Sequence, residues 1–330
     1  MKSRISSFLR IFVSLGLLGL LFWLMRDDIS GIGKTLFRAK PWHLVIGLVL
    51  LLINVFILAY RMKIIFEGEN IRMGFWESTQ LTYIGYFFNN FMPTAVGGDI
   101  VKAHYASLMN RKKVQSFASV LMDRFIGLYS FLIVAAVALV VDRGRLGISA
   151  VTPLVLSLLA LGLAGFAVVT NTRIAGWVET ALSKLKMLSL GEKIHAVYKI
   201  VHDYRNRTDV VGRSLAASII GQAVYFIVVY LFFGSLGYNV SIGNIFLIMP
   251  IVTFISMLPS IGGLGVREGA TMAFFAPLVG KEIAFAGSLL LLFGLFFLSF
   301  IGGAIYLWWA LSGVVKTGEI KEEDPFAEAL

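Results

Sequence analysis

The sequence contains no cysteine and only four histidines. The absence of cysteine excludes thiolate zinc sites, iron–sulfur clusters, disulfides and cysteine nucleophiles. Only His195 and His202 lie near each other in the sequence, on a polar amphipathic segment, where a solvated helix face explains them better than a metal site. We therefore expect neither a metal nor a cofactor.

Charged residues are also scarce, at 15% of the chain, whereas hydrophobic residues make up 58%. Residues 214–266 contain no charged side chain at all. This composition is typical of a polytopic membrane protein and not of a soluble domain. The formal net charge of +10 would suggest nucleic acid in a soluble chain, but here basic loops beside anionic lipid headgroups explain it. No nucleic-acid partner is expected.

One polar stretch, residues 87–105, interrupts the first apolar half. Pro93 removes a backbone N–H, and the Gly97-Gly98 pair favours a break over a straight helix. Asp99 is predicted to be the N-cap of a new half-helix that runs toward Met109. Broken backbone at membrane depth is tolerated where protein or a watery cavity satisfies its polar groups, so this stretch is predicted to line a site.

A second interrupted stretch, residues 257–269, repeats the pattern. The hexapeptides GGDIVK (97–102) and GGLGVR (262–267) share a glycine pair, a fifth-place valine and a sixth-place basic residue, and half the chain length separates them. Interrupted apolar segments at matching places in two halves are typical of a transporter binding site. The alternative is that two glycine-rich kinks resemble each other by chance.

The apolar runs divide the chain into two membrane halves. The first half, 1–170, contains the broken segment 83–109, and the second half, 210–315, contains the broken segment 243–281. The predicted fold is an all-α polytopic membrane protein with six to eight transmembrane helices, whose two broken or re-entrant segments form an inverted-repeat arrangement.

Between the halves, residues 171–209 carry apolar side chains at helical spacing among Lys and Arg, which predicts an amphipathic linker on the membrane surface. Residues 316–330 are predicted to be a cytoplasmic tail. The second span is expected to end near Tyr60, with Arg61 and Lys63 at the interface and an amphipathic segment at 66–78.

Loop charges predict the orientation. Most of the 29 Lys and Arg residues lie at the N-terminus and in the loops at 60–75, 102–113 and 171–213. Because basic loops stay in the cytoplasm, both termini are predicted to be cytoplasmic.

Six ionisable residues are expected inside the membrane, where such groups usually face a cavity or a partner. Lys102 and Arg267 each follow a glycine break, near a half-helix N-terminus whose free N–H groups favour an anion, and a lipid phosphate is the natural candidate. The alternative is structural pairing, for example of Asp99 with Lys102. The six residues are Asp99, Lys102, Asp123, Arg124, Arg267 and Glu268.

Three ordered motifs, NNFMPTAVGGDIVK (89–102), SVLMDRFIGL (119–128) and LPSIGGLGVREG (258–269), resemble the lysylphosphatidylglycerol synthase transmembrane family, also called flippase-like membrane proteins. The resemblance covers about residues 5–315. In that family the membrane region, when fused to a cytoplasmic aminoacyl-transferase domain, is thought to move the modified lipid between leaflets. This sequence ends at Leu330 with no transferase domain, so aminoacyl transfer is not expected.

The resemblance and the two breaks together predict the substrate-binding residues. They are Asn89, Asn90, Pro93, Thr94, Gly97, Gly98, Asp99, Lys102, Asp123, Arg124, Pro259, Ser260, Gly262, Gly263, Gly265, Arg267 and Glu268.

The predicted function is that of a lipid flippase or transporter of the bacterial inner (plasma) membrane, not an enzyme, which binds an anionic or polyprenyl-type headgroup between the two glycine breaks. Stand-alone relatives are associated with polyprenyl-linked sugars and hopanoids, so the resemblance leaves the lipid open. Two alternatives stay open. One is a non-catalytic scaffold of a lipid-modifying enzyme, and the other is a membrane-embedded transferase that uses Asp99 or Glu268 as its base. The expected partners are membrane lipids and, for the scaffold, a lipid-modifying enzyme.

Overall fold

The computed structural model describes residue 16, residues 18–26, 28–92 and 96–142, residues 153, 155–157, 159–162 and 164, residues 203–258, residue 260 and residues 262–312. All regular elements in these ranges are helical, which confirms the all-α prediction. Most of the predicted linker and the C-terminal tail lie outside the described residues.

Four helices are long and apolar enough to cross a membrane, counting only the described part of the chain. They are α3 (Pro41–Gly68), α6 (Lys113–Asp142), α10 (Thr208–Ser235) and α13 (Lys281–Ser312). Proline at the first position starts α3, where its missing N–H costs no hydrogen bond. Gly237, with φ of 89°, lies in the turn that follows α10.

Shorter helices surround the two predicted breaks. The first break separates α4 (Phe75–Phe91) from α5 (Gly97–Asn110), and the second separates α11 (Ile242–Ile255) from α12 (Val266–Val279). The remaining short elements are α2 (Ile29–Phe37) and the 3₁₀ turn η1 (Tyr204–Asn206).

Proline chemistry accounts for the end of α4. Met92, the residue before Pro93, has an extended backbone with ψ of 141°, as expected for a residue that precedes proline. With 17 and 14 residues, α4 and α5 are about 26 and 21 Å long, shorter than the roughly 30 Å hydrocarbon core. They pack against each other, so this segment is a helical hairpin, each arm of which is too short to span the hydrocarbon core alone.

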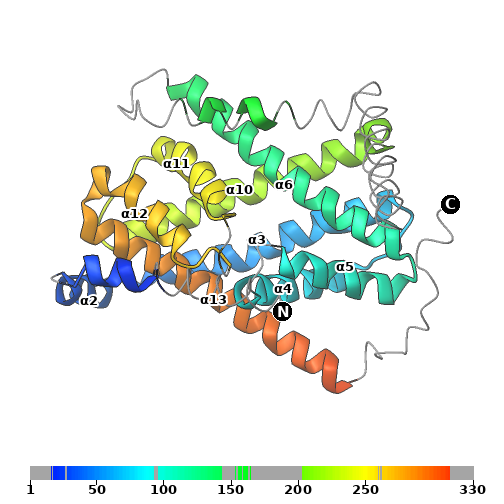
Figure 1. Cartoon of the computed structure of the whole chain (residues 1–330), viewed down its shortest axis with the longest axis horizontal. Helices are drawn as coiled ribbons and strands as arrows, with labels where there is room; N and C mark the ends of the chain where they lie inside the picture. Colours follow the sequence, from blue (N-terminus) through cyan, green and yellow to red (C-terminus); the bar gives the residue numbers. More distant parts are fainter. Residues whose placement is uncertain are drawn as a thin grey trace.

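The long helices hold the two hairpins in place. Helix α3 packs mainly on α10, and α13 packs on both α4 and α12 (Figure 1). In Figure 1 the α4–α5 pair lies to the right of the α11–α12 pair. An inverted repeat requires that the two hairpins enter from opposite faces of the membrane, and this part of the fold stays a prediction.

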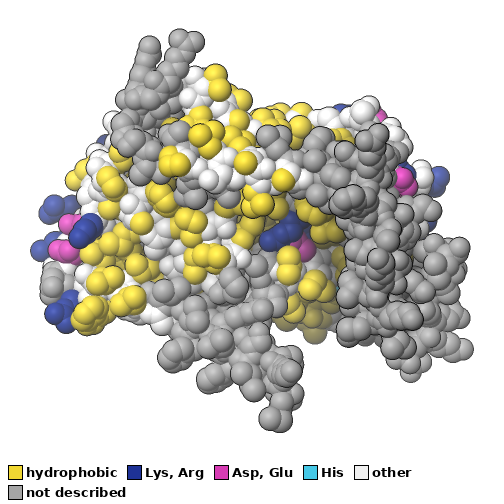
Figure 2. Space-filling view, turned by 45° about the horizontal axis from the view of Figure 1, so that its top comes forward, with side chains coloured by type: hydrophobic (Ala, Val, Ile, Leu, Met, Phe, Trp, Pro, Cys, Tyr) yellow, Lys and Arg dark blue, Asp and Glu magenta, His cyan; other side chains and the backbone are white. Residues whose placement is uncertain are grey.

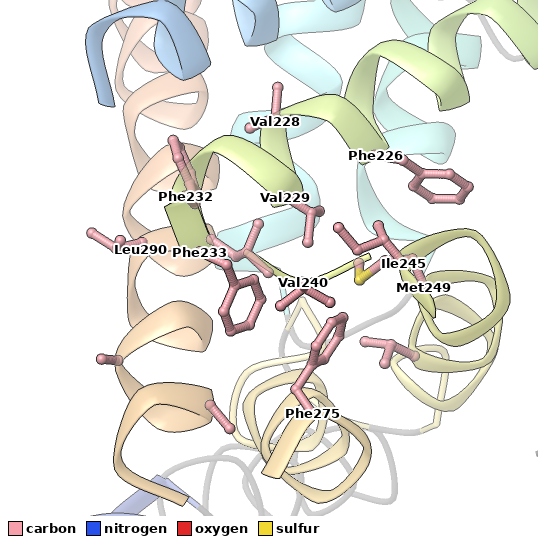
Figure 3. Close-up of a cluster of buried hydrophobic side chains, with 14 of the residues drawn as sticks. Phe226, Val228, Val229, Phe232, Phe233, Val240, Ile245, Met249, Phe275 and Leu290 are labelled. Carbon is pink, nitrogen blue, oxygen red and sulfur yellow. The ribbon is translucent and has the colours of Figure 1, made fainter. Parts of the chain in front are cut away.

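A hydrophobic cluster joins α10, α11, α12 and α13 (Figure 3). The rings of Phe233 and Phe275 stack with centroids 4.7 Å apart, and Phe226 meets Phe246 edge-on at 4.9 Å. Aromatic pairs in these arrangements add to the gain from burial. Many side chains of this cluster come from the charge-free stretch of the second half.

Two local predictions are wrong. The second span does not end near Tyr60, because α3 continues to Gly68 and buries Arg61. Residues 66–78, predicted to be amphipathic, form the end of α3, a connection at 69–74 and the start of α4, and buried and exposed residues alternate along the connection. Asp99 is not an N-cap, since α5 begins at Gly97 and Asp99 lies in its first turn.

Candidate functional site

The first break depends on a close approach between α4 and α5. A Cβ on Gly98 would collide with the carbonyl oxygen of Gly85, so only glycine fits there. The backbone N–H of Gly98 donates to Asn89 Oδ1 at 2.9 Å. This bond satisfies one of the free N–H groups at the start of α5. The hairpin thereby holds the first turn of α5, with Asp99 and Lys102, against α4.

The second break is a glycine turn that leads into α12. Gly262, Gly263 and Gly265 have φ of 56°, 80° and 80°, a left-handed conformation that glycine adopts without strain. Glu268, in the first turn of α12, accepts a hydrogen bond from the N–H of Gly265 at 2.6 Å. Its carboxylate also accepts from Arg267 at 2.9 and 3.0 Å, so the two predicted residues pair with each other.

The two breaks touch. A Cβ built on Gly262 would lie 2.8 Å from both Asn89 O and Asn90 Cα, in the last turn of α4. Asn90 continues this contact across the bundle, because its Nδ2 donates to Ser299 Oγ of α13 at 2.5 Å. The second glycine turn therefore packs on the end of α4, where the first break begins, although the two breaks lie half a chain apart in sequence.

Next to this junction, five charged side chains from three helices form a chain of ion pairs. Lys102 Nζ lies 2.9 Å from Asp99 and 3.8 Å from Asp123. Asp99 also accepts a hydrogen bond from Arg124. Arg61 of α3 holds the other carboxylate, with Nε and NH2 donating to the two oxygens of Asp123 at 2.7 and 2.9 Å.

These groups line a cavity of about 350 Å³. Figure 2 shows a group of basic and acidic side chains among hydrophobic ones near the middle of one face. Together with Arg267 and its partner Glu268, the site combines four cationic and three anionic groups, a net charge of one positive unit. The predicted residues that line the cavity are Asn89, Asp99, Lys102, Asp123, Arg124 and Arg267.

Other predicted residues shape the site without lining it. Gly98 and Gly262 permit close backbone contacts, and the Ser260 hydroxyl is buried and donates to Leu258 O at 3.1 Å. Asn90 and Glu268 bond to neighbouring groups, as described above. Pro93, Thr94 and Pro259 lie outside the described residues.

Sequence reasoning missed Arg61, Asn54 and Gln222, which also line the cavity. Arg61 lies near the end of an apolar run, and we had assigned it to the interface. Asn54 is a single amide inside a long apolar run, and Gln222 is one inside the charge-free stretch. A polar side chain in such a setting is the signal that could have identified them.

The carbonyl oxygens of the two amides Asn54 and Gln222 are buried beside the cavity. Gln222 Nε2 donates to Gly127 O at 3.1 Å and also to Ser130 Oγ, which fixes the orientation of the amide. Its Oε1 and the Oδ1 of Asn54 have no hydrogen-bond partner within the ranges that the structure describes. Buried polar atoms are normally paired, so these acceptors are suited to donors from a ligand.

The family model described as lysylphosphatidylglycerol synthase TM region matches residues 7–303. The chain is 23% identical over 287 residues to a UPF0104 membrane protein of Methanothermobacter thermautotrophicus, covering 81% of this chain and 84% of the relative. It is 26% identical over 317 residues to a UPF0104 membrane protein of Pyrococcus horikoshii, covering 86% and 91%. No solved structure matches the chain.

Proposed function

The chain belongs to the lysylphosphatidylglycerol synthase TM region family, and on this premise we propose that it is a lipid flippase or transporter. The headgroup of an anionic or polyprenyl-type lipid binds in the cavity beside the two glycine breaks, while its tails stay in the bilayer. Movement of one half against the other then exposes the site to each leaflet in turn. The protein works without a cofactor, in the plasma membrane, with both termini in the cytoplasm.

The single observation that carries the proposal is a charged cavity next to the junction of the two broken segments. Charges inside a membrane protein are costly and mark the pathway of a substrate or ion in most cases. Here the breaks and the charges lie together, in the arrangement that is typical of transporters with interrupted helices.

The size and charge of the cavity indicate which part of a lipid it accepts. A volume of about 350 Å³ suits a headgroup and is at the low end for whole small ligands. The net positive charge favours a phosphate. The carbonyl oxygens of Asn54 and Gln222 can accept hydrogen bonds from hydroxyl or amine groups on the headgroup.

The scaffold alternative has one observation in its favour: the cavity charges also pair with one another. The scaffold alternative and the transport proposal differ in whether the purified protein alone moves lipid. A scaffold of a lipid-modifying enzyme needs its partner, whereas a flippase does not.

The test is the rate at which labelled phosphatidylglycerol and a polyprenyl phosphate change leaflet in liposomes that contain the purified protein and no donor substrate. We expect exchange to be faster than in protein-free liposomes. If no anionic lipid in such a panel moved faster, the flippase proposal would be refuted and the scaffold favoured.

Lys102→Gln is the informative variant. Asp99 keeps Arg124 and Asp123 keeps Arg61 when Lys102 is lost, so folded yield should be preserved. A charged hydrogen bond contributes about 1.5–3 kcal/mol, so lipid affinity should fall by about 10- to 100-fold. Arg213→Gln removes an exposed cation of α10 and should behave like the wild type. Equal transport by both variants would contradict the assignment of the site.

A further inference from the structure

The carboxylate of Asp99 already occupies the place that the proposed site offers to an anion. It lies on Lys102 at 2.9 Å and accepts a hydrogen bond from Arg124, and all three side chains line the cavity. A phosphate oxygen that takes this place between the two cations competes with the carboxylate for it.

Asp123 is held differently. Arg61 grips both of its oxygens, and Arg61 is itself fixed by a 2.8 Å hydrogen bond to Ser218 Oγ of α10. Asp99 is held on one oxygen by Lys102 and on the other by Arg124, with no single guanidinium on both, and it is the more exposed of the two, with 15% of its side chain accessible against 8% for Asp123. Asp99 is thus the carboxylate that an incoming anion can move.

A displaced Asp99 has few ways to keep its charge. The other charged and titratable groups around the cavity are Arg61, Tyr86, Asp123, Tyr225 and Arg267. Arg61 is occupied by Asp123, and Arg267 by the fully buried Glu268. The freed carboxylate would also lie beside the phosphate, and a nearby like charge disfavours the ionised form.

We infer that the anionic headgroup exchanges with Asp99 on Lys102 and Arg124, and that the released Asp99 carboxylate takes up one proton from water. The inference rests on the proposed function and adds how lipid transport is coupled to a proton gradient. Each bound lipid anion arrives with one proton, which Asp99 gives back to water when the lipid leaves and the carboxylate returns to its cations. A proton gradient can then drive the lipid across the membrane.

The test counts protons on binding. Calorimetric titration of the purified protein with short-chain phosphatidylglycerol, in two buffers of different ionisation enthalpy, measures proton uptake directly. We expect about one proton per lipid near neutral pH, and an affinity that falls up to tenfold per pH unit as pH rises above the pKa of the displaced carboxyl. This measurement needs no variant.

Two variants identify the carboxyl. Asp99→Asn has no carboxylate to protonate, so lipid should bind to this variant without proton uptake, and the dependence of lipid affinity on pH that Asp99 causes should be lost. Asp209→Asn, an exposed carboxylate at the start of α10, should take up protons like the wild type.

The outcomes separate the two proposals. Lipid binding and leaflet exchange without proton uptake would overturn the coupling and leave the flippase proposal standing, as would unchanged uptake in Asp99→Asn. Absence of any lipid binding or movement would overturn both.

Discussion

Asp123→Asn is expected to destabilise the folded protein strongly, because it leaves Arg61 buried with no carboxylate. The two side chains are only 10% and 8% exposed, and their two hydrogen bonds of 2.7 and 2.9 Å are the geometry of a strong pair. Removing one member of a buried pair costs about 3–5 kcal/mol. Asparagine has nearly the shape of aspartate, so the loss of stability comes from the removed charge and not from a cavity in the packing.

The double variant Arg61→Met with Asp123→Leu should recover most of that loss. Replacing a whole buried pair by apolar residues of similar volume is often neutral or stabilising. Free energies of unfolding for the wild type, Arg61→Met, Asp123→Leu and the double variant, measured in mixed micelles, form the required cycle.

An exposed pair supplies the control. Asp209 and Arg213 lie 3.0 Å apart on α10 with side chains 71% and 58% exposed, and such pairs contribute about 0–1 kcal/mol. Asp209→Asn should therefore cost less than about 1 kcal/mol. If Asp123→Asn cost no more than this control, or if the double variant were as unstable as Asp123→Asn, the buried-pair reasoning would be refuted.

Three further predictions concern the backbone and the topology. Gly98→Ala should destabilise the protein by about 1–3 kcal/mol in the same unfolding assay, because the new methyl group meets Gly85 O. Gly212→Ala, where nothing lies within 4 Å of the new methyl group, should be neutral or stabilising. Equal effects of the two substitutions would contradict the close packing of α4 on α5. A cysteine at exposed Lys34 should react with an impermeant thiol reagent from outside and one at exposed Arg111 should not, and the opposite pattern would reverse the proposed orientation. At least one cysteine pair that joins Ala95 or Val96 to Ser260 or Ile261 should crosslink under mild oxidation, which needs Cα atoms within about 7 Å. If all four pairs failed to crosslink, also with a longer linker, the two turns would not lie next to each other.

Several features of the fold follow from local sequence alone. The apolar runs at about 114–141 and 283–309 predict α6 and α13 closely, because one hydrophobic helix satisfies its own backbone in lipid. The run at about 215–236 predicts the end of α10, but this helix begins earlier, at Thr208. The break after Phe91 follows from Pro93 and the glycine pair, and the second break from the glycines at 262–265. The two-halves arrangement with its predicted linker stays a prediction.

The sequence also identified most of the charged side chains of the cavity, since an ionisable residue within an apolar run is conspicuous. It named one pairing, that of Asp99 with Lys102, which the structure confirms at 2.9 Å. It did not predict that Asp123 pairs with Arg61, which lies 62 residues earlier on another helix, or that Asp99 also pairs with Arg124. Periodicity and composition describe one helix at a time, whereas an ion pair depends on the rotation and depth at which two helices pack. For this reason only the tertiary structure decided that Arg61, Asn54 and Gln222 face the same cavity as the two glycine breaks.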